Sequence, residues 1–335
     1  MHAAIPTRKL GPFASSAIGL GCMNLSHAYG APPEPKAATR MLEMALDLGY
    51  THLDTAALYG FGANETLIGE TLGHRRHEYF LASKGGMFRN AEGKREINGH
   101  PKAIREHCEA SLQRLKTEVI DLYYLHRWDM RVPIEESVGA MADLVREGKV
   151  RTLGLSEVSA ASLRKAHAEH PIAALQTEYS LWTRNPEIAV LAACRELGVA
   201  FVAFSPLARA FLTGKLTDVS GFAANDIRRP MPRFAAETYA ANLKLLGGYA
   251  EVAREADCTM AQLALAWLLA KGEDIVPIPG TANPEHLAEN AGAAKVMLTA
   301  EMVARLDELI NERTVIGPRY PLAVQAEIDT EEFPA

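Results

Sequence analysis

Short runs of β-branched and aromatic residues alternate with helical stretches along almost the whole chain. Eight runs read as strands, at residues 16–20, 51–54, 79–84, 119–126, 150–156, 174–179, 199–205 and 274–280. Several of the helical stretches between them have proline in the first turn or glycine after the last. This series has no linker and no composition shift, so it predicts one closed parallel (β/α)8 barrel over residues 1–335. An open doubly wound sheet is the alternative.

Two stretches exceed the plain strand–helix repeat. A polar loop at 217–235 follows the seventh strand and leads into extra helix, and a further helix is expected at 299–312. Neither stretch has the composition of a separate domain.

Charge and hydropathy exclude several classes of protein. The net charge is −6, and lysine and arginine are dispersed, so a nucleic-acid partner is not expected. The most apolar stretch, at 259–270, is shorter than the ~20 residues that span a bilayer. The first residues lack the apolar core of a signal peptide, so the simplest expectation is a cytosolic protein without a membrane anchor.

Cysteine and histidine spacing gives no sign of a disulfide framework or a metal site. The four cysteines are far apart and contain no CxxC pair, so reduced thiols are expected. His74 and His77 have ligand spacing but no third ligand in view. We therefore expect no bound metal.

Polar side chains stand at the ends of consecutive predicted strands. Asp54 ends the second strand and Lys84 the third, His126 ends the fourth, and Tyr59 follows Asp54 on its loop. Each alone has an ordinary structural explanation, such as a helix cap or a hydrogen-bonded core histidine. In a barrel of this class, however, all four would meet at the carboxyl rim, where catalytic groups lie.

These four side chains suit the delivery of a proton to a carbonyl oxygen. A phenol has a pKa near ~10. A lysine ammonium within ~4 Å favours phenolate by about 4 kcal/mol at a surface-like dielectric, although burial opposes this. Lys84 would tune Tyr59, Asp54 would hold Lys84, and His126 would donate to the carbonyl. The set contains no nucleophile with its own base, so a separate hydride source is required.

Longer motifs carry a resemblance to a known family. They include GLGCMNLSHAYG (19–30), LDTAALYG (53–60), IDLYYLHR (120–127), LQTEYSLW (175–182), FSPLARAFLTGK (204–215) and PGTANPEHLAEN (279–290), all in family order. The chain resembles the aldo-keto reductases, in particular a bacterial and plant subgroup. This resemblance implies a barrel that binds NADPH across its carboxyl rim and a catalytic set of Asp54, Tyr59, Lys84 and His126.

The resemblance also implies which residues bind the coenzyme. Positions near the nicotinamide and its ribose are expected in the first loop, with two polar residues on the carboxamide and one aromatic ring stacked on the nicotinamide. The segment after strand seven matches the pyrophosphate region, and the last loop matches the adenosine and its 2′-phosphate. The matching residues are Gly21, Cys22, Met23, Asp54, Ser156, Gln176, Phe204, Ser205, Pro206, Leu207, Arg209, Lys215, Arg228, Gly280, Ala282, His286, Glu289 and Asn290.

In one respect the chain departs from the family pattern. The family often has arginine or lysine near the positions of Ala282 and Asn283, and neither residue is basic here. His286 and the loop arginines Arg228, Arg229 and Arg233 remain as candidates for the 2′-phosphate. NADPH is therefore expected to be preferred less strongly than usual, with NADH possible.

The expected activity is reversible reduction of an aldehyde or ketone to an alcohol. Rim residues expected to line the substrate pocket are Met23, Tyr29, Phe88, Arg127 and Trp128. A Schiff-base aldolase using Lys84, or a coenzyme-binding regulatory subunit, are the alternatives. The sequence leaves the substrate and the oligomeric state open.

Overall fold

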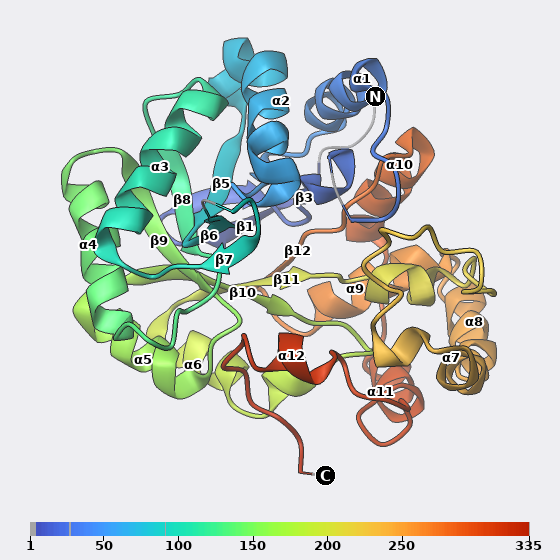
Figure 1. The fold of residues 1–335 in the computed structure, drawn as a ribbon. Coiled ribbons are helices and arrows are strands. Elements are labelled where there is room, and N and C mark those ends of the chain that lie inside the picture. The colour runs from blue at the N-terminus through green and yellow to red at the C-terminus, as the bar shows by residue number, and fades with distance from the viewer. Residues whose placement is uncertain (1–4, 27, 91, 335) are drawn as a thin grey trace.

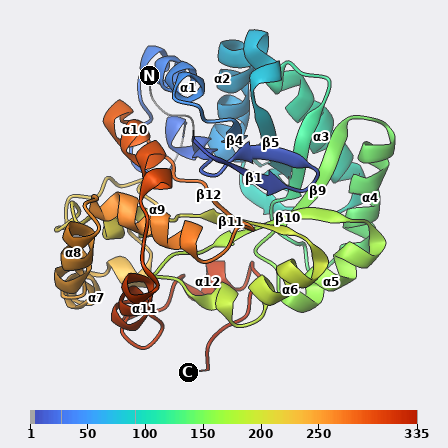
Figure 2. The same ribbon diagram turned by 180° about the vertical axis from the view of Figure 1, so that it is seen from behind.

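A closed parallel sheet forms the centre of the computed structural model, which describes residues 5–26, 28–90 and 92–334 (Figures 1 and 2). The amide of Gly19 donates to the carbonyl of Pro277 at 3.0 Å, and that of Gly21 to Pro279 at 3.1 Å, so the end strands meet. The barrel prediction is confirmed. In sheet order the strands are β12 (Ile275–Pro277), β11 (Ala200–Phe204), β10 (Ile172–Glu178), β9 (Val150–Ser156), β8 (Ile120–Leu125), β5 (Phe80–Gly85), β4 (His52–Asp54) and β3 (Leu20–Gly21).

Helices surround the barrel, as Figure 1 shows. Proline stands in the first turn of α1 and α3, and the predicted stops at Gly49, Gly148 and Gly198 all have positive φ, which glycine adopts without strain. The helices that alternate with the strands are α1 (Pro35–Asp47), α2 (Ala63–Leu72), α3 (Pro101–Leu115), α4 (Ile134–Arg146), α5 (Ala160–Glu169), α6 (Val190–Leu197), α9 (Met260–Ala270) and α10 (Pro284–Gly292).

Additional elements lie where the sequence exceeds the plain repeat. Helices α7 (Ala236–Leu243) and α8 (Leu246–Glu255) follow the seventh strand, and α11 (Ala300–Leu309) lies near the C-terminus, as predicted. Short α12 (Leu322–Gln325) was not predicted. No helix in the described ranges combines the length and apolar character needed to cross a membrane.

Two hairpins were missed by the sequence analysis. The first strand was placed at 16–20, but residues 13–16 form β2 (Phe13–Ser16), which pairs antiparallel with β1 (Thr7–Leu10). The barrel strand β3 begins only at Leu20. The second hairpin consists of β6 (Met87–Arg89) and β7 (Arg95–Ile97), and it follows β5 at the carboxyl rim.

Two hydrophobic clusters explain why the strands are so apolar. Alternate side chains of a strand point to opposite faces, and both faces of this sheet are covered. The larger cluster fills the space between strands and helices. The smaller one fills the barrel, where Leu10 of the first hairpin packs against interior side chains such as Phe80 and Val202. Hairpin β1–β2 therefore closes the end of the barrel opposite the carboxyl rim.

One buried histidine makes the fold sensitive to acid. His52 on β4 is fully buried, both its ring nitrogens lack a hydrogen-bond partner in the described structure, and burial lowers its pKa to about 4. The unfolded chain therefore binds more protons between pH ~6.5 and pH 4, and stability falls as pH falls. We expect His52 alone to remove about 2 kcal/mol of unfolding free energy between pH 7 and pH 5.

Urea unfolding of the wild type and of His52→Leu at both pH values measures this effect. The variant should lose less stability on acidification, because its side chain cannot bind a proton. His74→Gln, at an exposed histidine, is the control and should follow the wild type. Parallel pH profiles for the wild type and His52→Leu would contradict the assignment.

Candidate active site

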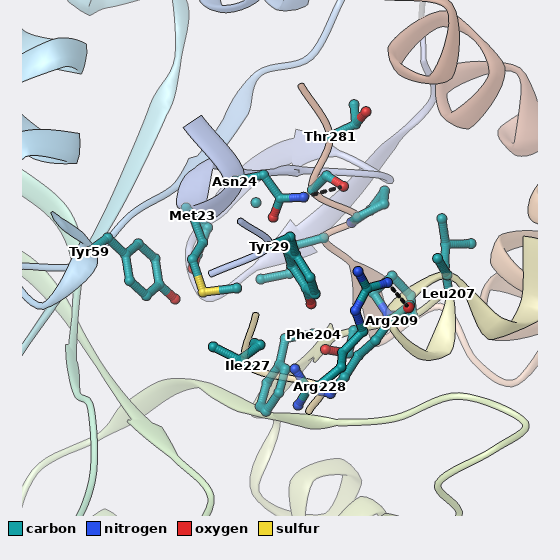
Figure 3. Close-up of a pocket in the computed structure, with 18 of the residues that line it drawn as sticks. Met23, Asn24, Tyr29, Tyr59, Phe204, Leu207, Arg209, Ile227, Arg228 and Thr281 are labelled. Carbon is teal, nitrogen blue, oxygen red and sulfur yellow. Dashed lines mark hydrogen bonds between the residues drawn. The ribbon is translucent and has the colours of Figure 1, made fainter. Parts of the chain in front are cut away.

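A cavity of about 1000 Å³ opens at the carboxyl ends of the strands. Loops after nearly every barrel strand contribute to its wall, and Figure 3 shows Tyr59, Met23, Tyr29 and Phe204 projecting into the same space. Most of the residues expected from the sequence line this cavity. They are Gly21, Met23, Tyr29, Asp54, Tyr59, His126, Arg127, Ser156, Gln176, Phe204, Ser205, Pro206, Leu207, Arg209, Lys215, Arg228, Gly280, Ala282, His286, Glu289 and Asn290.

Lys84 and Asp54 form a buried ion pair at the floor of the cavity, where Asp54 is part of the wall. They end neighbouring strands β5 and β4, and their side chains are 1% and 2% exposed. The Nζ atom of Lys84 donates to Asp54, to the carbonyl oxygen of Thr55 at 2.8 Å and to the hydroxyl of Tyr59 at 3.2 Å. The three side chains thus form one hydrogen-bonded chain that ends on a phenol in the cavity.

Burial and neighbouring charges have opposite effects on the pKa values of Lys84 and Tyr59. Burial disfavours the ammonium of Lys84, but Asp54 and Tyr59 outweigh it, so the pKa of Lys84 lies above its usual value. Burial also raises the pKa of Tyr59, and the opposing effect of Lys84 is smaller. The expected net lowering of the phenol pKa is therefore wrong for the free protein. Tyr59 carries its proton at neutral pH, which is the form a proton donor needs.

His126 lies directly after β8 and faces the phenol. Its ring meets that of Tyr59 edge to face, with centroids 5.9 Å apart at 85°. Burial, reinforced by Arg127, holds the pKa of His126 well below its usual value, so the imidazole is neutral. A neutral imidazole keeps one N–H, and Nδ1 has no hydrogen-bond partner in the described structure.

Two polar residues expected on the carboxamide are held by charged neighbours. The Nε2 atom of Gln176 donates to Asp54 Oδ2 at 2.7 Å, and Arg127 Nη1 donates to the hydroxyl of Ser156 at 3.1 Å. Ser156 ends β9 and Gln176 lies near the carboxyl end of β10, and both line the cavity. Phe204, at the end of β11, adds an aromatic surface to the same region (Figure 3).

The segment after β11 bends tightly along the cavity. Ser205, Ala208, Arg209 and Ala210 all have positive φ, a conformation that costs non-glycine residues about 1–3 kcal/mol each. Buried Arg209 ties the bend to the barrel, because it pairs with Glu178 at 2.8 Å. This bend turns Ser205, Pro206 and Leu207 towards the cavity.

Cationic groups gather at the end of the cavity away from Tyr59. Lys215 Nζ lies 3.5 Å from His286 Nε2, although the two residues are on different loops. Arg228 also lines the cavity, with its guanidinium over the rings of Phe222 and Tyr29 at 4.0 and 4.9 Å. Arg233 points elsewhere, to the carbonyls of Trp182 and Gly317, which removes it as a phosphate candidate.

Four expected site side chains lie outside the cavity. Cys22 is fully buried in the core, and its Sγ donates to the carbonyl of Leu20, so the thiol does not face the cavity. Trp128 donates to the carbonyl of Val132 at 2.8 Å, and Phe88 packs edge to face on Phe61. Lys84 is not part of the cavity wall, but it donates to the hydroxyl of Tyr59, which is. Sequence places a residue on a loop but does not fix the direction of its side chain.

A segment near the C-terminus, residues 319–329, contributes to the cavity wall and was not predicted from the sequence. Its lining residues are Tyr320, Pro321, Val324 and Glu327. Arg319 anchors this segment in a buried ion pair with Glu157. Other wall residues that were not predicted include Asn24, Leu58, Met87, Arg95, Ile227, Pro230 and Met231. No local sequence signal marks such long-range contacts. No cluster of metal-binding side chains occurs among the residues that the structure describes.

Comparison with known proteins shows what the chain is similar to. The Aldo/keto reductase family profile matches residues 17–311. The chain is 43% identical to "Aldo-keto reductase yakc [NADP(+)]" of Schizosaccharomyces pombe, covering 99% of both chains. It is 42% identical to "Probable aldo-keto reductase 1" of Glycine max, covering 95% of this chain and 93% of that protein.

Solved structures are also similar to this chain over most of its length. A glycerol dehydrogenase from Gluconobacter oxydans has a TM-score of 0.84 at 27% identity, over 95% of this chain and 99% of that one. An aldo/keto reductase from Klebsiella pneumoniae in complex with NADP and acetate has a TM-score of 0.70 at 28% identity, with the same coverage.

Proposed function

The chain belongs to the aldo/keto reductase family, and from this premise we propose that it reduces an aldehyde or ketone to an alcohol with NADPH. The observation that carries the proposal is the bond between Lys84 and the hydroxyl of Tyr59 at 3.2 Å, at the floor of the cavity. A protonated phenol beside a neutral imidazole is a proton donor next to a hydrogen-bond donor.

The cavity suits a nicotinamide dinucleotide phosphate. One end offers an aromatic ring, a hydroxyl and an amide, at Phe204, Ser156 and Gln176, and the other end offers the nitrogen donors of Lys215 and His286. A relative and a solved neighbour carry NADP in their names. When bound, NADPH supplies the hydride.

The side chains then have separate tasks. His126 donates a hydrogen bond to the substrate carbonyl oxygen and orients it towards the phenol. Tyr59 gives its proton to that oxygen as negative charge develops there. The ammonium of Lys84, held by Asp54, stabilises the phenolate that remains. In alcohol oxidation the same groups act in reverse.

The two alternatives predict different measurements. A Schiff-base aldolase needs a neutral lysine, whereas Lys84 is buried against a carboxylate with a raised pKa, which disfavours this role. NADPH absorbance with a panel of aldehydes, quinones, steroids and sugars tests the reductase. Borohydride trapping with a ketone tests the aldolase. Tight NADPH binding without turnover on any carbonyl would favour the regulatory subunit.

We expect NADPH to bind more tightly than NADH by about one to two orders of magnitude in Kd. Lys215 and His286 together replace the missing arginine, but neither can donate the two parallel hydrogen bonds that an arginine makes to phosphate. Fluorescence titration of both coenzymes measures this.

Single substitutions separate the two side chains. Lys215→Met should reduce the preference by removing the ammonium, and His286→Gln should reduce it by removing the ring nitrogen that contacts Lys215. Lys165→Met, at an exposed lysine on α5, is the matched control. A preference above a thousandfold would transfer the role to Arg228. Tighter binding of NADH would overturn the assignment.

A further inference from the structure

The side chain of Arg127 lies beside His126, and one nitrogen of its guanidinium group is held by hydrogen bonds. Arg127 follows His126 directly, lines the cavity and is half-buried. Its Nη1 atom donates to the carbonyl oxygen of His126 at 2.8 Å and to the hydroxyl of Ser156 at 3.1 Å. Its Nε and Nη2 atoms make no hydrogen bond within the described structure. The planar group is thus held in place while one edge still has donors to offer.

The other cations near this end of the cavity are already neutralised. Arg95 forms two hydrogen bonds to Glu327, Lys84 pairs with Asp54, and Arg209 pairs with Glu178. In contrast, no carboxylate of the described residues lies within 4.0 Å of Arg127. A positive charge therefore remains uncompensated beside the proton donor.

Neighbouring wall residues limit what this charge can bind. Met23, Leu58, Met87 and Val324 supply an apolar surface that suits a compact hydrocarbon body. Glu327, the acid at this end that could repel an anion, is engaged by Arg95 through both carboxylate oxygens. A guanidinium edge with free donors matches a carboxylate, which accepts two parallel hydrogen bonds.

We propose that the substrate is a carbonyl compound that also carries a carboxylate, and that Arg127 binds this carboxylate while the carbonyl oxygen meets Tyr59 and His126. This inference rests on the proposed reductase function and names its substrate class. An apolar body, such as an aromatic ring, would separate the two groups. Arg127 then selects the substrate by its charge.

A pair of near-isosteric aldehydes tests the proposal. 4-Carboxybenzaldehyde carries the carboxylate, and methyl 4-formylbenzoate is its neutral counterpart. We expect the wild type to prefer the acid in kcat/KM by about tenfold to a hundredfold, as one charged bidentate contact provides. Arg127→Met should bring the ratio of the two kcat/KM values close to one, even if it also changes each value. Arg127→Lys should retain part of it, because the charge stays and the fork is lost.

Arg89→Met is the matched control, because it removes an exposed arginine of β6 that does not line the cavity. It should leave the acid-to-ester ratio close to that of the wild type. A wild-type ratio near one, or a ratio that Arg127→Met leaves intact, overturns the proposal. Loss of the ratio in Arg89→Met as well would assign the selection to the overall charge of the protein and overturn the proposal.

A binding measurement keeps this inference separate from the reductase assignment. Calorimetric titration of the coenzyme-free protein with 4-(hydroxymethyl)benzoate should give an affinity that Arg127→Met weakens about tenfold or more. Reduction of the ester without any preference for the acid refutes only the substrate class. Arg127-dependent binding of the acid, with neither aldehyde reduced, supports the carboxylate contact with Arg127 and refutes the reductase.

Discussion

Replacing Tyr59 with phenylalanine is expected to lower kcat by at least about 10², with NADPH affinity nearly unchanged. The substitution removes one oxygen, which accepts a hydrogen bond from Lys84 at 3.2 Å and faces the cavity beside His126. The ring stays, so the wall of the cavity keeps its shape. Because the lost hydroxyl is the proton donor, the effect should fall on the chemical step rather than on binding. Single-turnover kinetics with a saturating aldehyde measure that step directly.

Tyr79→Phe provides the control for this experiment. Tyr79 is also a buried phenol, but it lies outside the cavity and its hydroxyl has no hydrogen-bond partner in the described structure. Its loss should leave the rate of the chemical step unchanged. If Tyr59→Phe keeps more than half of the wild-type rate with chemistry limiting, then Tyr59 is not the proton donor.

Strand ends were predictable because the barrel repeats a simple pattern. Each apolar run is long enough for only one pass through the sheet, so a polar residue at its end, such as Asp54 or Lys84, must emerge at the carboxyl rim. The parallel register then sets neighbouring ends side by side, and the ion pair between β4 and β5 follows. The first strand was misplaced because Ser16 belongs to the hairpin, so the barrel strand β3 begins only at Leu20, near the end of the predicted run.

Contacts between distant segments were not predictable. Glu327 meets Arg95 across 232 residues, and Arg319 meets Glu157 across 162. Nothing in the local sequence of either pair distinguishes it from ordinary surface charge. The direction of the Tyr59 pKa shift failed for a related reason. It depends on how deeply the phenol is buried, which many residues determine together.

Lys84→Met is expected to abolish activity and also to destabilise the fold. Both members of the ion pair are almost fully buried, so removal of the ammonium leaves the charge of Asp54 without its partner. Breaking one side of a buried pair costs about 3–5 kcal/mol. Urea unfolding measures this loss, and Lys9→Met, at an exposed lysine of β1, should show almost none.

A double variant separates the loss of activity from the loss of stability. Asp54→Asn combined with Lys84→Met removes both charges, and the Asn amide can still pair with Gln176, which already contacts Asp54 at 2.7 Å. Much of the lost stability should return, because a neutral buried pair has no uncompensated charge. Activity should stay absent, since no cation remains to stabilise the phenolate of Tyr59. Recovery of turnover in the double variant would show that Lys84 serves the fold alone, and that the phenol needs no charge beside it.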